Sequence, residues 1–149
     1  MQQQHFNTTL LVDQSAEEVF QAINNVQGWW SQDFKGASQQ LNDVFEVRFG
    51  DVHYSQHQLT ELIPGQKITW LTTDSRISFV REKSEWTGTH IHFDISRQAD
   101  GQTLLRFTHE GLVPEITCFQ DCAKGWHHFL SSLEQLITSG KGRPYAEQP

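Results

Sequence analysis

The spacing of apolar and polar residues changes along the chain, and each spacing predicts a different element. Residues His5–Val12 are apolar and β-branched enough for a strand. Ser15 and Glu18 then form a capping-box pattern ahead of an apolar stripe at helical spacing, which predicts a helix over Ala16–Asn24. Gly28 stops or bends that helix, and two adjacent tryptophans follow it.

The middle of the chain has the period of two that is typical of antiparallel strands. Turn signals such as Pro64-Gly65 separate the strands, which we expect at Val44–Gly50, Val52–Ile63, Lys67–Thr73, Thr89–Ser96 and Thr103–Thr108. The stretch Asp74–Trp86 has no clear period. We interpret it as a connection that holds at most a short strand or turn at Ile77–Val80.

The period becomes three and four residues from Glu115 onward, which predicts one long amphipathic helix over residues 115–139. Helix-ending residues bracket it, with Pro114 ahead and Gly140, Gly142 and Pro144 behind. We expect Phe129 and Leu133 to pack against the concave face of the sheet. An antiparallel sheet covered by a C-terminal helix belongs to the α+β class.

The length of 149 residues fits a single domain, residues 1–149, whose loose termini we expect at residues 1–4 and 141–149. The formal net charge is −7, and no run of basic residues occurs, so nucleic acid is a poor candidate partner. The N-terminus lacks a signal-peptide pattern, and no apolar stretch is long enough for a membrane span. We therefore expect a cytoplasmic protein that does not bind membranes.

The two cysteines, Cys118 and Cys122, lie four residues apart in the predicted helix, where their side chains are poorly directed for a disulfide. We expect both thiols to be reduced. Together with His109 or His127 they could supply three metal ligands. The positions of the eight histidines in the sequence do not define a convergent set of metal ligands, so we expect no metal site. We also find no catalytic or nucleotide-binding motif and predict no cofactor.

Several segments, taken in order, resemble the START-like (SRPBCC) superfamily with its helix-grip, birch-pollen-allergen-like fold. They are AEEVFQAI, the Trp29-Trp30 pair, LTELIPGQKITW across the third and fourth strands, EWTGTHIHFDI, and TLLRFTHEGL leading into CFQDCAKGW. The resemblance runs from Phe6 to Gly142, and within the superfamily it points to the heat-shock protein 90 ATPase activator-like group. It implies a curved antiparallel sheet wrapped around the long helix, with a short helical region after the first strand.

The same resemblance implies a cavity between helix and sheet that in many relatives holds an apolar or amphipathic small molecule. It implies no reaction, because the superfamily includes carriers, cyclases, sensors and co-chaperone domains. The chain offers no additional N-terminal domain of a dedicated chaperone activator, so we expect chaperone contact to be weak.

His109 differs from the other histidines because the alternation of TLLRFTHEGL carries the inward face from Leu105 through Phe107 to it. A buried histidine needs hydrogen-bond partners, so His109 either bonds within the protein or faces a ligand. Glu110 should point to the other face, which argues against a His-Glu catalytic pair.

Five tryptophans exceed what a plain core of this size requires, and they either line an apolar ligand cavity or fill a wide sheet. We predict the ligand-binding residues to be Trp29, Trp30, Trp70, Trp86, Phe93, Phe107, His109, Cys122 and Trp126, with no catalytic residue.

The predicted function is binding of a small apolar or aromatic molecule between the C-terminal helix and the sheet. A cyclase or hydrolase that uses His109 as its acid–base group is one alternative, and a chaperone-associated protein-binding domain is another. We expect a monomer or a homodimer.

Overall fold

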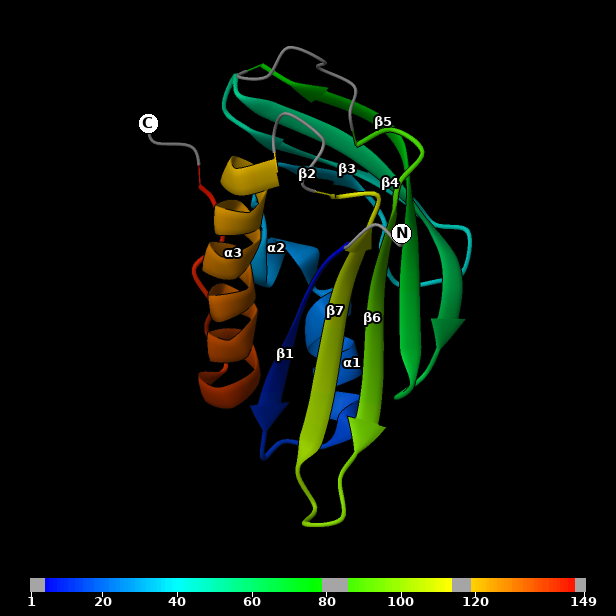
Figure 1. The fold of residues 1–149 in the computed structure, drawn as a ribbon, viewed down its shortest axis with the longest axis vertical. Coiled ribbons are helices and arrows are strands. Elements are labelled where there is room, and N and C mark those ends of the chain that lie inside the picture. The colour runs from blue at the N-terminus through cyan, green and yellow to red at the C-terminus, as the bar shows by residue number, and fades with distance from the viewer. Residues whose placement is uncertain (1–4, 79–85, 114–118, 147–149) are drawn as a thin grey trace.

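The chain folds into one curved antiparallel sheet with helices on its concave side, as the computed structural model in Figure 1 shows. The structure describes residues 5–78, 86–113 and 119–146. Along the chain the elements are β1 (Phe6–Val12), α1 (Ala16–Asn24), α2 (Val26–Trp29), β2 (Phe34–Gly36), β3 (Val44–Phe49), β4 (His53–Ile63), β5 (Lys67–Ile77), β6 (His90–Arg97), β7 (Thr103–Glu110) and α3 (Phe119–Ser139).

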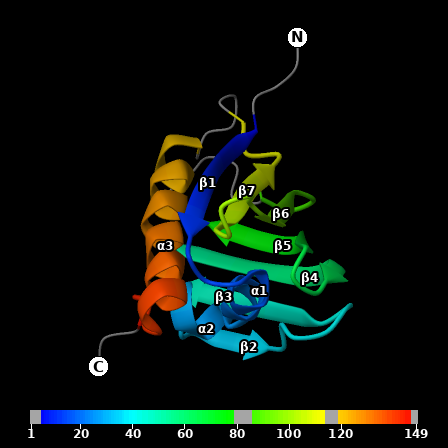
Figure 2. The same cartoon turned by 90° about the horizontal axis from the view of Figure 1, so that it is seen from below.

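The seven strands lie in the order β1-β7-β6-β5-β4-β3-β2, and every neighbouring pair is antiparallel. Helix α3 packs against α1, α2 and β1, and Figure 2 shows it running along one side of the curved sheet. The predicted α+β class and helix-grip architecture are therefore confirmed.

Helix α1 begins where the capping-box pattern predicted. The Glu18 amide donates to Ser15 Oγ at 3.1 Å, and the Glu18 carboxylate accepts from the Ser15 amide at 3.4 Å. These bonds satisfy amide groups that the first turn of a helix leaves without partners. The apolar stripe of the helix, which includes Val19 and Ile23, is buried.

The alternation of the strands decides which side chains face the helices. In β7, Leu105, Phe107 and His109 are buried, whereas Arg106 and Glu110 between and after them are exposed. Strands β3 and β6 bury alternate residues in the same way. The inward face therefore forms one core with α1 and α3, as the period of two predicted.

Strand β5 differs from the prediction because it continues to Ile77, through residues that we had interpreted as a connection. Across the register shift in β4, Gln56 pairs with Asp74 and His57 pairs with Thr72, which leaves Thr73 of β5 without a facing residue in the strand register. Such a bulge resets the alternation and hides the second half of the strand from a pattern search. The remainder of the predicted connection, residues 79–85, lies outside the described residues.

Two short elements, α2 and β2, were not predicted, since neither is long enough to show a period. Gly28 lies inside α2 rather than ending a helix. The described part of the long helix begins at Phe119. The predicted start at residue 115 and Cys118 lie outside the described residues, so the state of the two thiols stays a prediction.

The segment after α3 was expected to be loose but is attached where it is described. The Arg143 amide donates to Ser132 Oγ at 2.6 Å, and the Tyr145 amide donates to the Trp30 carbonyl at 2.9 Å. At Gly142, an added Cβ would lie 2.5 Å from the Gly28 carbonyl oxygen, so this position has no room for a larger residue. Residues 142–145 thus form a strap across α2 and α3.

Leu133 gives a test of the helix face, because its side chain is fully buried against the core. We expect Leu133→Ala to lower the free energy of unfolding by about 2 to 5 kcal/mol, the usual result of removing a buried leucine side chain. Exposed His128 on the same helix is the control, and His128→Ala should change stability by no more than about 0.5 kcal/mol. Equal effects in denaturant unfolding would contradict the assigned face.

Candidate ligand cavity

A cavity of about 310 Å³ lies between the first half of α3 and the sheet. Its lining residues are mostly aromatic and come from the α2–β2 region, the β3–β4 hairpin, the turn before β6, α3 and the C-terminal strap: Trp30, Phe49, Val52, His53, Trp86, Asp121, Cys122, Gly125, Trp126, Phe129 and Tyr145. Exposed Val52 and Asp121 lie where the cavity meets solvent. Its volume is within the range of small-molecule sites.

Trp30, Trp86 and Trp126 form the wall nearest the core, and together with Trp29 and Trp70 behind them they make up the tryptophan cluster. Trp30 is central, with nearly parallel rings of the other four at centroid distances of 5.1 to 6.5 Å. Trp86 and Trp126 stack on each other at 5.5 Å with an interplanar angle of 11°. Such offset stacking adds to the free energy gained from burial of the rings.

One histidine behind this wall links two of its tryptophans. The Trp126 indole donates to His109 Nδ1 at 3.0 Å, and the other ring nitrogen, Nε2, lies 2.8 Å from Thr89 Oγ1. Thr89 Oγ1 in turn donates to the Trp86 carbonyl at 2.6 Å. Because Trp126 can only donate, Nδ1 must accept and Nε2 must carry the proton. His109 is therefore held as one neutral tautomer.

The surroundings of His109 favour the same neutral form. Burial, and to a lesser degree the nearby histidines, lower the pKa of His109 from its ordinary value of about 6.5 to about 3. Protonation at Nδ1 would also remove the bond from Trp126 and leave that indole without its acceptor. The sequence left two roles open for His109: hydrogen bonds within the protein, or contact with a ligand. Hydrogen bonds within the protein account for both of its ring nitrogens.

A second buried chain of hydrogen bonds starts at the cavity wall in β4. His53 Nε2 lies 3.0 Å from Ser55 Oγ, which lies 2.8 Å from His57 Nε2. His57 Nδ1 lies 3.0 Å from Thr72 Oγ1 on β5. Burial lowers the pKa of His53 to about 3 and, with nearby His53 and His109, lowers that of His57 well below its ordinary value. Both imidazoles are therefore neutral.

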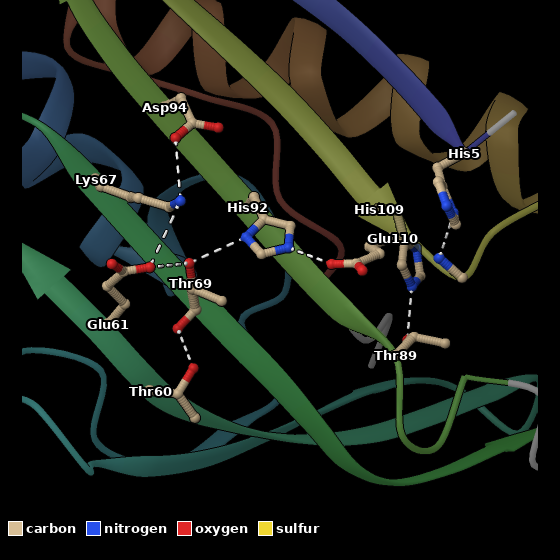
Figure 3. A network of polar contacts seen from close by, with 11 residues as sticks. His5, Thr60, Glu61, Lys67, Thr69, Thr89, His92, Asp94, His109 and Glu110 are labelled. Carbon is tan, nitrogen blue, oxygen red and sulfur yellow. Dashed lines mark hydrogen bonds and ion pairs between the residues drawn. The ribbon is translucent and has the colours of Figure 1, made fainter. Parts of the chain in front are cut away.

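The opposite face of the sheet carries a separate polar network (Figure 3). His92 Nε2 donates to Glu110 Oε1 at 2.8 Å, and this bond holds the pKa of Glu110 below its ordinary value. Lys67 lies 3.6 Å from both Glu61 and Asp94. As predicted, Glu110 points away from His109. Among the described residues, no group of three or more His, Cys, Asp or Glu is placed to hold a metal ion.

The structure brings four of the nine predicted ligand-binding residues to the cavity: Trp30, Trp86, Cys122 and Trp126. The other five, Trp29, Trp70, Phe93, Phe107 and His109, are buried behind that wall and are absent from the lining. They face the correct side of the sheet, but other aromatic rings cover them. Inward direction therefore predicted burial for these residues, and coverage by other rings decided which inward residues reach open space.

Sequence reasoning missed seven lining residues, which fall into two kinds. Phe129 was predicted to pack against the sheet but was not assigned to a cavity, whereas Phe49 and His53 lie in predicted strands whose inward faces were a usable signal. Val52, Asp121, Gly125 and Tyr145 gave no signal in the sequence, since a turn, a helix edge and a terminal segment bring them together.

The neutral histidines predict a specific dependence of stability on pH. Their pKa values are lower in the folded than in the unfolded chain, so the stability that they contribute is complete above about pH 6.5 and is lost as the pH falls toward 3. Each can add a slope of at most about 1.4 kcal/mol per pH unit. We expect His109→Phe to reduce this slope in denaturant unfolding between pH 7.5 and 5.

The control for that measurement is exposed His127 on α3, and His127→Phe should leave the slope unchanged. An NMR titration of the wild type that places the pKa of His109 at or above about 6.5 would contradict the buried, neutral assignment.

Comparison with known proteins finds no matching family model and no matching curated protein. Solved structures do match. The Aha1 dimer from Colwellia psychrerythraea shares 25% identity over 93% of this chain and 99% of its own, with a TM-score of 0.76. The protein SSP2350 from Staphylococcus saprophyticus shares 17% identity over 96% of this chain and 98% of its own, with a TM-score of 0.70.

CalU16 from Micromonospora echinospora is more distant, with 15% identity over 90% of this chain and 76% of its own and a TM-score of 0.64. In the described part of this chain, no helix is both long enough and apolar enough to cross a membrane. The resemblance that the sequence motifs indicated is confirmed: the chain has the helix-grip fold of the START-like superfamily, with an Aha1 protein among its structural neighbours.

Proposed function

We propose that this protein binds a small apolar or aromatic molecule in the cavity between α3 and the sheet, and we assign no catalysis to it. The observation that carries the proposal is the aromatic cavity of about 310 Å³. Ligand sites are typically apolar hollows of this size with a few polar groups. Trp30, Trp86 and Trp126 would offer ring surface, and His53 would offer a polar group.

Gly125 supports this proposal from the side of the helix. It lines the cavity within the first half of α3, and an added Cβ would meet no atom within 4 Å. A glycine inside a helix costs about 1 kcal/mol relative to alanine. Gly125 therefore weakens the helix but leaves open space at the cavity, as expected if this space is used for binding.

The enzyme alternative finds less support at the residue first considered for it. Both ring nitrogens of His109 are bonded to protein atoms, and the ring lies behind the cavity wall. A cyclase or hydrolase reaction would require another acid–base group.

The chaperone alternative rests on a different observation, the 25% identity with an Aha1 protein over nearly the whole chain. By the same comparison, a homodimer would be a reasonable assembly, since that neighbour was solved as a dimer.

Native mass spectrometry of freshly purified protein separates these proposals, because it would detect a bound small molecule, a second copy or a captured chaperone by mass. A cytoplasmic location stays a prediction.

Filling the cavity tests the binding proposal. We expect Gly125→Phe to place a ring in the open space and to weaken binding of naphthalene, measured by equilibrium dialysis, by at least about tenfold. The smaller Gly125→Ala is the matched control. It should retain binding and raise stability by up to about 1 kcal/mol. Absence of naphthalene binding to the wild type, or equal binding to wild type and Gly125→Phe, would contradict a site in this cavity.

A further inference from the structure

The few polar groups of the cavity restrict the chemistry of a ligand more than its aromatic walls do. Among its lining residues in the described part of the chain, none is a lysine or an arginine, and Asp121 contributes a carboxylate at the edge. The net charge of the chain is also negative, at −7. An anionic ligand would therefore bury its charge without a cationic partner, which is costly.

Among the lining residues, His53 combines a fixed position with a remaining hydrogen-bonding atom that can either donate or accept, whereas the indole Nε1 of Trp86, which also has no hydrogen-bond partner in the described part of the chain, can only donate. His53 Nε2 is engaged with Ser55, whereas its Nδ1 has no hydrogen-bond partner among the residues that the structure describes. The ring is held edge-on against Trp86 at 4.6 Å and Phe49 at 5.0 Å. These contacts hold the ring in place, so a ligand would meet Nδ1 in one position.

The chain behind His53 lets Nδ1 act either as a donor or as an acceptor. The hydroxyl groups of Ser55 and Thr72 can rotate, and each can donate or accept. If Ser55 donates to His53 Nε2, the imidazole proton is on Nδ1. If Ser55 instead donates to His57, His53 Nε2 carries the proton and Nδ1 accepts. Both arrangements keep the two imidazoles neutral and the chain of hydrogen bonds complete.

We propose that the cavity selects neutral aromatic molecules that carry a hydroxyl or carbonyl group, and that His53 Nδ1 is the group that recognises this oxygen. The inference rests on the proposed ligand-binding function and specifies its ligand class. A hydroxyl would donate to Nδ1 in one arrangement of the chain, and a carbonyl would accept from it in the other. The low pKa of His53, about 3, keeps the ring neutral throughout the physiological range.

Four naphthalene compounds test this inference by equilibrium dialysis at pH 7.5: naphthalene, 2-naphthol, 2-acetonaphthone and 2-naphthoate. The wild type should bind the alcohol and the ketone roughly fivefold more tightly than naphthalene, the usual effect of one additional neutral hydrogen bond. The carboxylate should bind most weakly.

His53→Phe keeps an aromatic ring in the wall and removes both nitrogens. The quantity compared is the ratio of its affinity for the alcohol or the ketone to its affinity for naphthalene, and this preference should disappear. His53→Asn, whose amide restores a hydrogen-bonding atom near the position of Nδ1, should recover part of that preference. Thermal unfolding checks that both variants are folded. If His53→Phe does not fold, His53→Asn alone tests whether His53 recognises the ligand oxygen.

The outcomes separate the inference from the function on which it rests. If the wild type binds naphthalene and 2-naphthol equally, or if His53→Phe retains the preference, His53 does not recognise the ligand oxygen although the cavity binds. Tightest binding of 2-naphthoate would overturn the neutral-ligand class. If none of the four compounds binds, the proposed function itself fails.

Discussion

The packing of Trp30 is the constraint on which the rest of this structure depends. Its ring contacts tryptophans from α2, β5, α3 and the turn before β6, and its backbone carbonyl accepts from the Tyr145 amide of the C-terminal strap. Close packing makes the position of one such ring dependent on all the others. The concave face of the sheet, the helix and the strap are therefore placed around a single side chain, which also forms a wall of the cavity.

Buried polar groups make this aromatic interior specific. Flat rings of similar size could slide past one another, because stacking energy changes gradually with offset. The bond from the Trp126 indole to His109 fixes the orientation of that ring, and the continuation through Thr89 holds the backbone of Trp86 beside it. Each bond adds little net stability, but loss of one partner leaves a buried group unsatisfied, which costs more. The histidines thus act as neutral connectors that depend on a dry environment.

The sequence predicted those parts of the fold in which one period persists over a whole element. Helix α1 begins at its capping box, and β6 and β7 bury alternate residues as their patterns required. The second half of β5 was missed because the bulge at Thr73 changes the phase of the pattern. The strap was missed because Gly142 and Tyr145 are held by contacts with α2, α3 and the residues after α2, which lie far away in the sequence.

The candidate site was harder to predict than the fold, and the reason is geometric. A period identifies which side chains point inward, and Trp70 and Trp126 satisfy that criterion equally well. Only Trp126 reaches the cavity, since open space requires an inward residue that no other side chain covers. That condition depends on where side chains are small or absent, as at Gly125, and on where the strap ends at Tyr145. Empty space is therefore a property of the whole packing arrangement, and no local pattern of residues encodes it.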